Sequence, residues 1–270
     1  MTSVVVVADS VTALPESARS AVLVTGSHGG MIAAHYALAA GVRAVVFNDA
    51  GRGLDDAGIA GVAALDGAGM AAAAVAHTSA RIADGSDTLE RGVISFANDL
   101  AGALGVAAGM PCREAAERLR AAAAPAGRLP RQRESRLIFA PAGERRTAIV
   151  GLDSIGGVVA ADAGLVLVIG SHGGLHGGVP ASALPVDAAG AIFHDAGGGR
   201  DGAGWSRLPV LDARGIPAAT AGHLSARIGD ARSMWETGEL THVNEGAART
   251  GLREGMTVRA SAATLALFRN

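Results

Sequence analysis

Short apolar runs, separated by glycine-rich turns and helical stretches, make up most of this chain. In its first half, Met31–Ala40 and Asp55–Leu65 have helical composition, and Asp87–Leu104 is a longer amphipathic helix candidate. The β-like runs of this half are Val4–Ala8, Ala21–Thr25, Val42–Phe47 and Ala71–Ala76. Strands that alternate with helices predict an α/β fold with a doubly wound, mostly parallel sheet and flanking helices.

The second half repeats this pattern. Residues 125–134 have the composition of a linker, and Ser135–Ala140 is expected to form an added strand. The next β-like runs are Ala148–Gly151, Leu165–Ile169, Ala191–Phe193 and Ala218–Ala221. One segment differs: where the first half has the helix Met31–Ala40, Leu175–Pro185 contains Pro180 and Pro185, which disfavour a continuous helix. We interpret it as an altered loop over one of two sites.

Three polar motifs occur twice along the chain. The motif Gly-Ser-His-Gly-Gly occupies 26–30 and 170–174, and Asp-Ala-Gly occupies 49–51 and 195–197. His-x-Ser-Ala-Arg-Ile-x-Asp occupies 77–84 and 223–230. This recurrence predicts two tandem duplicated halves related by a pseudo-twofold axis. We place the first α/β repeat at residues 1–126, and the second, with its linker and added strand, at residues 127–270.

Composition excludes several classes of function. All 23 basic residues are arginine, so Schiff-base chemistry and a P-loop lysine are excluded. Cys112 is the single cysteine, which excludes an internal disulfide and a cysteine-rich metal site. The net charge of −2 argues against nucleic acid as a partner, and the short apolar runs argue against a membrane span. The first residues lack a basic leader, so a cytoplasmic location is expected.

The repeated motifs follow predicted strands, where ligands meet the carboxyl edge of a parallel sheet. The catalytic candidates are His28, Asp49 and His77 in the first half and His172, Asp195 and His223 in the second. An imidazole titrates near neutral pH and needs a fixed partner that selects its tautomer, a role open to Asp49 and Asp195. The same two aspartates could instead cap a following helix or bind a metal. The second half also contains His176, His194 and His242, which have no histidine counterpart in the first half. These additional imidazoles make the second half the preferred working site.

Substrate binding is assigned to the residues around these groups. Glycine amides after each Ser-His pair could stabilise an oxyanion, although such glycines also serve plain turns. Arg81 and Arg227 would hold an anionic group, or would pair internally with Asp84 and Asp230. The substrate-binding candidates are Ser27, Gly29, Gly30, Ser79, Arg81, Asp84, Ser171, Gly173, Gly174, Ser225, Arg227 and Asp230.

The sequence therefore predicts a hydrolase or lyase that needs no cofactor and acts on a small anionic carbonyl compound. Two alternatives stay open. One is a non-catalytic protein that binds small anions, and the other is a metal-dependent hydrolase that uses a divalent ion held by histidine and aspartate. Self-association into a homo-oligomer is expected from the alanine-rich helix at Arg113–Ala124.

Overall fold

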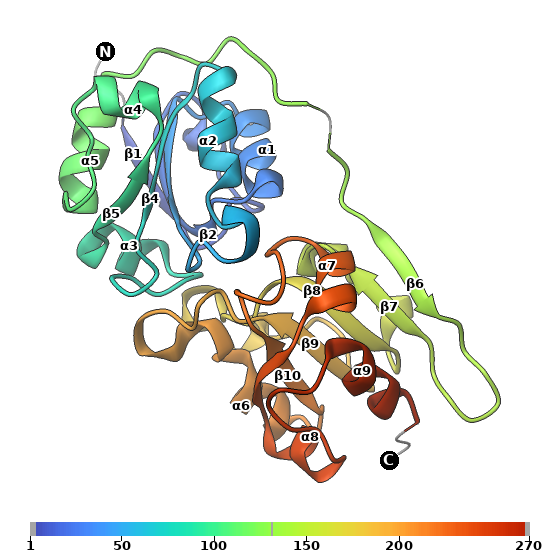
Figure 1. Ribbon diagram of the computed structural model, residues 1–270. Helices are drawn as coiled ribbons and strands as arrows, with labels where there is room; N and C mark the ends of the chain where they lie inside the picture. Colours follow the sequence, from blue (N-terminus) through green and yellow to red (C-terminus); the bar gives the residue numbers. More distant parts are fainter. Residues whose placement is uncertain (1–3, 131, 268–270) are drawn as a thin grey trace. The chain divides into compact units, whose positions relative to one another are not determined.

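A computed structural model describes residues 4–130 and 132–267 (Figure 1). Contacts within the chain divide it into two units. The first comprises Met1–Arg52, Asp56–Arg133 and Gly198–Ala203, and the second comprises Gly53–Asp55, Glu134–Gly197 and Gly204–Asn270. Each unit is described here by itself.

The first unit contains a five-stranded sheet whose strands lie in chain order. They are β1 (Val5–Ala8), β2 (Val22–His28), β3 (Ala44–Asn48), β4 (Ala71–Val75) and β5 (Ile94–Ala97). β1 to β4 run parallel, and β5 pairs antiparallel with β4. Because β2, β3 and β4 are parallel neighbours, the residues that follow them meet at one edge of the sheet.

Helices cover both faces of this sheet. They are α1 (Met31–Ala40), α2 (Ala60–Gly67), α3 (Gly85–Arg91), α4 (Asp99–Ala103) and α5 (Cys112–Leu119). Successive residues of a strand point to opposite faces, so Leu23 and Phe47 pack with α1 and α2, while Val24 and Val46 pack with α5. Figure 1 shows α1 and α2 side by side on one face.

The second unit contains a six-stranded sheet, also in chain order. Its strands are β6 (Arg136–Ala140), β7 (Ile149–Leu152), β8 (Val166–His172), β9 (Gly190–His194), β10 (Ala218–Ala221) and β11 (Leu240–Val243). The two outer strands, β6 and β11, pair antiparallel with their neighbours, and β7 to β10 are parallel. The helices are α6 (Arg207–Ala213), α7 (Ala231–Thr237), α8 (Glu245–Arg249) and α9 (Val258–Leu267).

The α/β class and the mostly parallel sheets are confirmed, but the doubly wound order is wrong. A doubly wound sheet reverses its strand order at a switch point, whereas both sheets here follow the chain without reversal. The connections through α1 and α2 advance by one strand each time, which leaves both helices on the same face. The opposite face is covered by helices that follow β4 and β5, such as α5.

Two predicted helices are also corrected. Asp87–Leu104 is divided into α3, β5 and α4, because Gly92 ends α3 and Ile94–Ala97 pairs with β4. The helix expected at Asp55–Leu65 begins only at Ala60, since Asp55 and Asp56 have the positive φ angles of 56° and 53°. In the second unit, Leu175–Pro185 contains two short 3-10 turns, His176–Gly178 and Pro180–Ser182, and the absence of a continuous helix there is confirmed.

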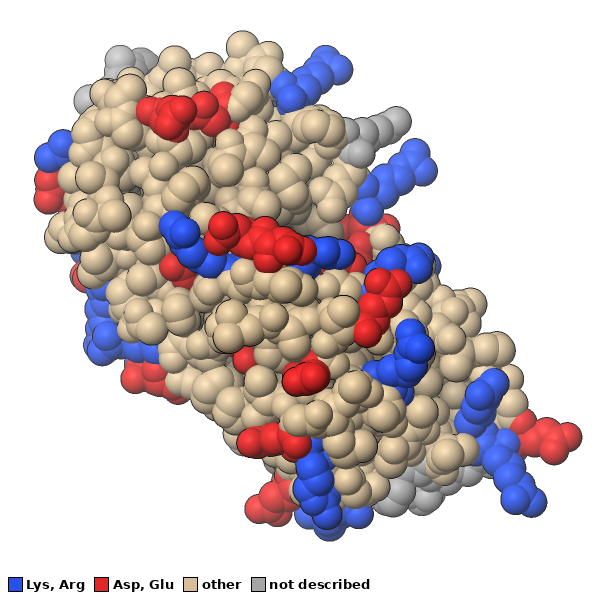
Figure 2. Space-filling view, in the orientation of Figure 1, with Lys and Arg blue, Asp and Glu red and all other residues tan. Residues whose placement is uncertain are grey.

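The surface offers few clues to a partner. Figure 2 shows arginine and acidic side chains interspersed over one face, as the small net charge leads one to expect. No helix within residues 4–130 and 132–267 is long and apolar enough to cross a membrane. Ala115, Ala116 and Ala122, which suggested a self-association surface, are buried against the first sheet. They therefore provide no argument for oligomerisation.

Candidate functional site

A buried carboxylate holds an imidazole at the carboxyl edge of the first sheet. Asp49 follows β3 and His77 follows β4; the side chain of Asp49 is 6 % exposed and that of His77 is 25 % exposed. Asp49 Oδ1 accepts hydrogen bonds from His77 Nδ1 at 3.0 Å and from the His77 backbone amide at 2.8 Å. Oδ1 also accepts from the Gly51 amide at 3.0 Å, and Oδ2 accepts from the Ser95 hydroxyl at 2.7 Å.

The second sheet presents the same contact. Asp195 Oδ1 accepts from His223 Nδ1 at 3.2 Å, from the His223 backbone amide at 2.9 Å and from the Gly197 amide at 2.9 Å. Because an ionised carboxylate can only accept, Nδ1 of the neutral imidazole carries the proton in His77 and in His223. The Nε2 atom of each ring is then the basic nitrogen.

Hydrogen bonds keep both carboxyl groups ionised despite their burial. Burial is the largest influence on each pKa and acts to raise it, because it disfavours the charged form. Several smaller influences together outweigh burial and lower both pKa values below the ordinary 3.8. They are the bonds from the His77 and Ser95 side chains and the His77 and Gly51 amides to Asp49. For Asp195 they are the bonds from His223 and the Gly197 amide and the electrostatic influence of His194 and His223. An anion therefore lies behind each imidazole.

The turn after each aspartate is strained. Ala50 and Ala196 have φ angles of 49° and 52°, a left-handed conformation that costs an L-residue about 1–2 kcal/mol. The glycines that follow, Gly51 and Gly197, are also left-handed, each with φ of 75°. Two consecutive left-handed residues turn the Gly51 and Gly197 amides back towards the carboxylates. Strain of this kind is often found at functional sites.

The hydrogen bonds of His28 and His172 select the opposite tautomer. Nδ1 of His28 accepts from the Gly30 amide at 3.1 Å, and Nδ1 of His172 accepts from the Gly174 amide at 3.2 Å. A nitrogen that accepts carries no proton, so the neutral rings have their proton on Nε2. Each unit therefore has one imidazole with a basic Nε2 and one with an Nε2–H donor, on strand ends that are two strand spacings, roughly 10 Å, apart.

The predicted oxyanion amides already have acceptors. Besides Gly30 and Gly174, which donate to histidine rings, Gly29 donates to the Asn48 carbonyl and Gly173 to the His194 carbonyl, both at 2.9 Å. Glycine is needed for close packing here, since a Cβ at position 29 would lie 2.6 Å from Val62 Cγ2. Both amide pairs serve the turn in this structure.

The four candidate serines also hold the backbone. Ser27 and Ser171 accept from the amides of Val11 and Ile155 at 2.9 and 3.0 Å. Ser79 donates to the Ala76 carbonyl. Ser225 likewise donates to the Gly222 carbonyl, at 2.9 Å. These contacts bring none of the four hydroxyls to the imidazole of His77 or His223.

The candidate arginines lie beside carboxylates. Arg227 donates from both Nε and Nη2 to Asp230 Oδ2, at 3.2 and 3.0 Å. Arg81 Nη1 lies 3.5 Å from Asp87 Oδ1 and 3.8 Å from Asp84 Oδ2. The internal pairing that the sequence left open is thus present for both arginines. An anion would have to compete with these carboxylates for the guanidinium groups.

Asp84 and Asp230 are the N-caps of α3 and α7. Asp84 Oδ1 accepts from the Asp87 amide, and Asp230 Oδ1 accepts from the Ser233 amide, both at 2.8 Å. We expect Asp84→Ala to lower the free energy of unfolding by about 1 kcal/mol, because the cap is lost. Asp84→Ser, which keeps an N-cap acceptor, should recover most of it. Denaturant unfolding of the two variants checks this, and equal stability would contradict the capping role.

Sequence reasoning missed one residue of the site, Ser95, and did not foresee the role of His194. Ser95 lies in β5, within a segment expected to be helical, so its approach to Asp49 could not be foreseen. His194 was expected as an additional imidazole and as a possible metal ligand. It is 1 % exposed, and both ring nitrogens bond to backbone, at 3.0 Å to the Ala196 amide and 3.0 Å to the Ala226 carbonyl. Its role is structural in this arrangement.

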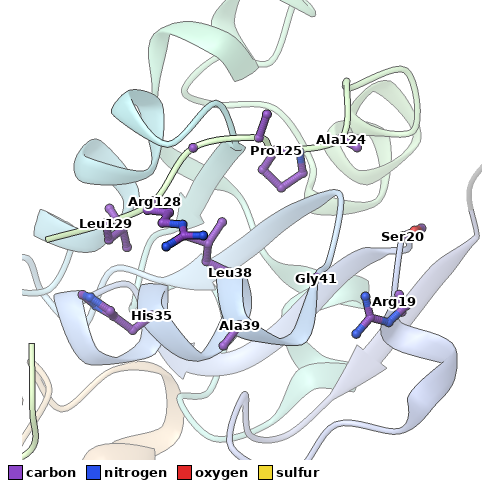
Figure 3. A pocket seen from close by; sticks show the side chains of 12 residues that line it. Arg19, Ser20, His35, Leu38, Ala39, Gly41, Ala124, Pro125, Arg128 and Leu129 are labelled. Atoms are coloured by element: carbon purple, nitrogen blue, oxygen red, sulfur yellow. The ribbon is translucent and has the colours of Figure 1, made fainter. Parts of the chain in front are cut away.

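A cavity of about 530 Å³ lies elsewhere in the first unit, beside α1. Figure 3 shows His35, Arg128 and Arg19 around it. Its lining comprises Arg19, Ser20, His35, Leu38, Ala39, Gly41 and residues 124–129. No sequence-predicted site residue is among them, so this cavity is separate from the Asp–His contact. Among the described residues, no cluster of three or more histidine, cysteine or acidic side chains could hold a metal ion.

No known protein family, curated protein or solved structure matches this chain. The functional proposal therefore depends on the geometry of the two Asp–His contacts.

Proposed function

We propose that this protein is an acid–base enzyme that needs no cofactor and acts, as a hydrolase or lyase, on a small anionic carbonyl compound. His77 and His223 are the general bases and take a proton at Nε2. Asp49 and Asp195 hold these rings in the Nδ1–H tautomer and stabilise the imidazolium that forms.

One observation carries the proposal: the same carboxylate oxygen binds both the ring Nδ1 and the backbone amide of its histidine. Two bonds to one residue fix the position of the ring as well as its tautomer. In a structural histidine such as His194, both ring nitrogens form hydrogen bonds with backbone groups. His77 and His223 instead each direct Nδ1 to a buried anion, which supports a role in proton transfer.

His28 and His172 complete the proposed chemistry as donors. Their Nε2–H groups would polarise the carbonyl oxygen of the substrate while the partner imidazole removes a proton. The strain at Ala50 and Ala196 further supports a functional assignment, since a plain turn does not require left-handed alanine.

The recurrence of the motifs is proposed to result from a duplication, with the two copies related by a pseudo-twofold axis. The similar Asp–His distances of 3.0 and 3.2 Å support this history. Anion binding by Arg81 and Arg227, a cytoplasmic location and self-association stay predictions. A non-catalytic anion-binding protein is the alternative, and it would bind small anions without turning them over.

Turnover of a panel of small carbonyl acids and esters by His77→Gln, His223→Gln and the double variant tests the proposal. Glutamine has a similar length but cannot take up a proton near neutral pH. We expect the double variant to lose about 10²-fold or more of kcat, with each single variant reporting the share of its own unit. His35→Gln, on α1, is the control and should keep full activity. Equal turnover by the double variant and the wild type would refute the assignment.

A further inference from the structure

Arg207, the first residue of α6, is a buried cation that the proposed chemistry does not use. Its side chain is 0 % exposed, and Nη1 donates to the carbonyl oxygens of Ala183, at 2.5 Å, and Ser182. Nε and Nη2 have no hydrogen-bond partner among residues 4–130 and 132–267. No carboxylate in that part of the chain forms an ion pair with Arg207. Unpaired buried charges are rare because their desolvation is expensive.

The two unpartnered atoms form one edge of the guanidinium group. The N–H bonds of Nε and Nη2 are parallel and match the two oxygens of a carboxylate. Arg227 uses the same edge, since its Nε and Nη2 both donate to Asp230. In Arg207 that edge is directed into the protein interior, where the guanidinium lies over the Phe193 ring at 5.6 Å from its centre.

Burial makes the Arg207 guanidinium more acidic. It lowers the pKa of the guanidinium well below its ordinary value, to about 10, which still leaves the group charged near neutral pH. The protein therefore keeps a positive charge in a low-dielectric environment, where the carbonyls of Ser182 and Ala183 accept hydrogen bonds from it. An anion at the Nε–Nη2 edge would offset this charge.

Arg207 belongs to the part of the second unit that differs most from the first. The residue 146 positions earlier is Gly61, where a Cβ would lie 2.3 Å from the Gly30 carbonyl and 2.8 Å from Ala34 Cβ. The helix α1 fills that space in the first unit. In the second unit the corresponding segment, Leu175–Pro185, is not an α-helix. The side chain of Arg207 reaches this segment and donates to two of its carbonyls.

The backbone ties Arg207 to the proposed catalytic turn. Its amide donates to the Gly173 carbonyl at 2.9 Å, one residue after His172. The His172 ring makes an edge contact with the His176 ring, with centres 5.9 Å apart. Residues 177–181 of the covering segment are exposed, and Gly177 and Gly178 have φ angles of 55° and 71°. An outward movement of this short segment would open the way to Arg207.

We propose that Arg207 binds the carboxylate of a small carboxylic acid through Nε and Nη2, beside the His172 turn and beneath the segment Leu175–Leu184. This rests on the proposed function and names the anionic group of its substrate. It also assigns anion recognition in the second unit to Arg207, because the same edge of Arg227 is occupied by Asp230.

Calorimetric titration with acetate, and with acetamide as the neutral isostere, tests the proposal at constant ionic strength. The wild type should bind acetate and not acetamide. Arg207→Met should bind acetate roughly 10- to 100-fold more weakly, which corresponds to losing one charge-assisted bidentate contact. Arg207→Lys, which keeps the charge but lacks the planar fork, should also lose affinity. The lysine variant replaces the methionine variant in this test if the latter fails to fold.

Arg214→Met is the matched control. Arg214 lies in the turn after α6 and donates to the Leu184 and Val186 carbonyls, so its loss loosens the same segment without touching the fork of Arg207. Acetate affinity should be unchanged in this variant. Equal losses in the Arg207 and Arg214 variants, or wild-type affinity in both Arg207 variants, would overturn the proposal. If the lysine variant also fails to fold, the wild type itself provides the test. Its Arg207 Nε–H resonance in the NMR spectrum should shift on addition of acetate and not on addition of acetamide.

The same titration separates this inference from the proposed function. His77→Gln together with His223→Gln should retain acetate binding while turnover is lost. If acetate binding depends on Arg207 but no turnover depends on the histidines, the binding site stands and the enzyme assignment falls. If turnover depends on the histidines and acetate binding does not depend on Arg207, the reverse holds.

Discussion

Asp49→Ala is expected to lower the free energy of unfolding of the first unit by about 3–5 kcal/mol, because a buried donor left without its acceptor costs about 1–3 kcal/mol. The exchange leaves the Gly51 amide, the His77 amide and ring, and the Ser95 hydroxyl without their acceptor. These donors are partly buried around a carboxylate that is only 6 % exposed, which limits their access to water. Asp195→Ala should have a similar effect on the second unit, where the donors found among the described residues are those of His223 and Gly197.

Asparagine separates the structural role of this aspartate from its charge. Both the His77 ring and the backbone amides donate to Oδ1, so an amide oxygen at that position can still accept from all of them. Asp49→Asn should therefore recover most of the lost stability. It still removes the negative charge behind the imidazolium, so the turnover of the first unit, measured in a His223→Gln background, should fall by about 10²-fold or more.

Guanidinium-induced unfolding and turnover of both variants check this expectation. Ser95→Ala, which removes the donor to Oδ2 alone, is the control and should cost about 1 kcal/mol. Alanine and asparagine variants of equal stability would mean that the hydrogen bonds to Asp49 contribute nothing. Undiminished turnover by the asparagine variant in the His223→Gln background would mean that the charge of Asp49 has no part in catalysis.

The strand-end residues of the site could be predicted from sequence because parallel neighbours bring the residues after each strand to one edge. Asp49 and His77 needed no more than the assignment of β3 and β4 as adjacent strands. The distinction between a helix cap and an orienting carboxylate could not be made. It depends on the left-handed turn at Ala50, whose φ angle leaves no trace in residue type.

The antiparallel strands β5 and β11 were not foreseen. Each is four residues long and lies between two short helices, so its period of two is too brief to stand out from the helical pattern around it. Ser95 was missed for this reason. The sequential strand order was also beyond reach, because alternating strands and helices are equally compatible with reversed and unreversed sheets.

Arg207 illustrates a different limit. Arginine at the start of a helix is ordinarily a surface residue, and nothing in the neighbouring sequence marks this one as buried. The available signals were an arginine at the position that Gly61 occupies in the other half and, separately, the segment Leu175–Pro185 with its two prolines. The second unit lacks a helix where the first has α1, and it gains the large side chain of Arg207. Only the structure shows that the two changes concern the same space.

His194→Asn should make the protein more resistant to acid. The residue 146 positions earlier is Asn48, which accepts from the Ala50 amide through Oδ1 at 2.9 Å and donates to the Ala80 carbonyl through Nδ2 at 3.2 Å. His194 makes the same kind of contacts through Nδ1 and Nε2. An amide can therefore replace this imidazole without losing either bond.

Burial lowers the pKa of His194 below its ordinary 6.5, against the opposing influence of the Asp195 charge and the bond to Ala226. Between these two pKa values the unfolded chain binds a proton that the folded protein does not. Stability from the neutral ring is thus fully present above pH 6.5 and is lost as pH falls, by at most about 1.4 kcal/mol per pH unit until the folded pKa is reached. The lowered pKa of Asp195 acts in the same direction only below about pH 3.8.

Unfolding free energies measured from pH 7.5 to 4.5 should therefore decline less steeply in His194→Asn than in the wild type, with the two curves diverging below pH 6.5. His35→Asn, which removes a partly exposed histidine of α1, is the control for the loss of an imidazole in general and should follow the wild-type curve. Parallel curves for His194→Asn and the wild type would show that His194 takes up its proton without unfolding the second unit.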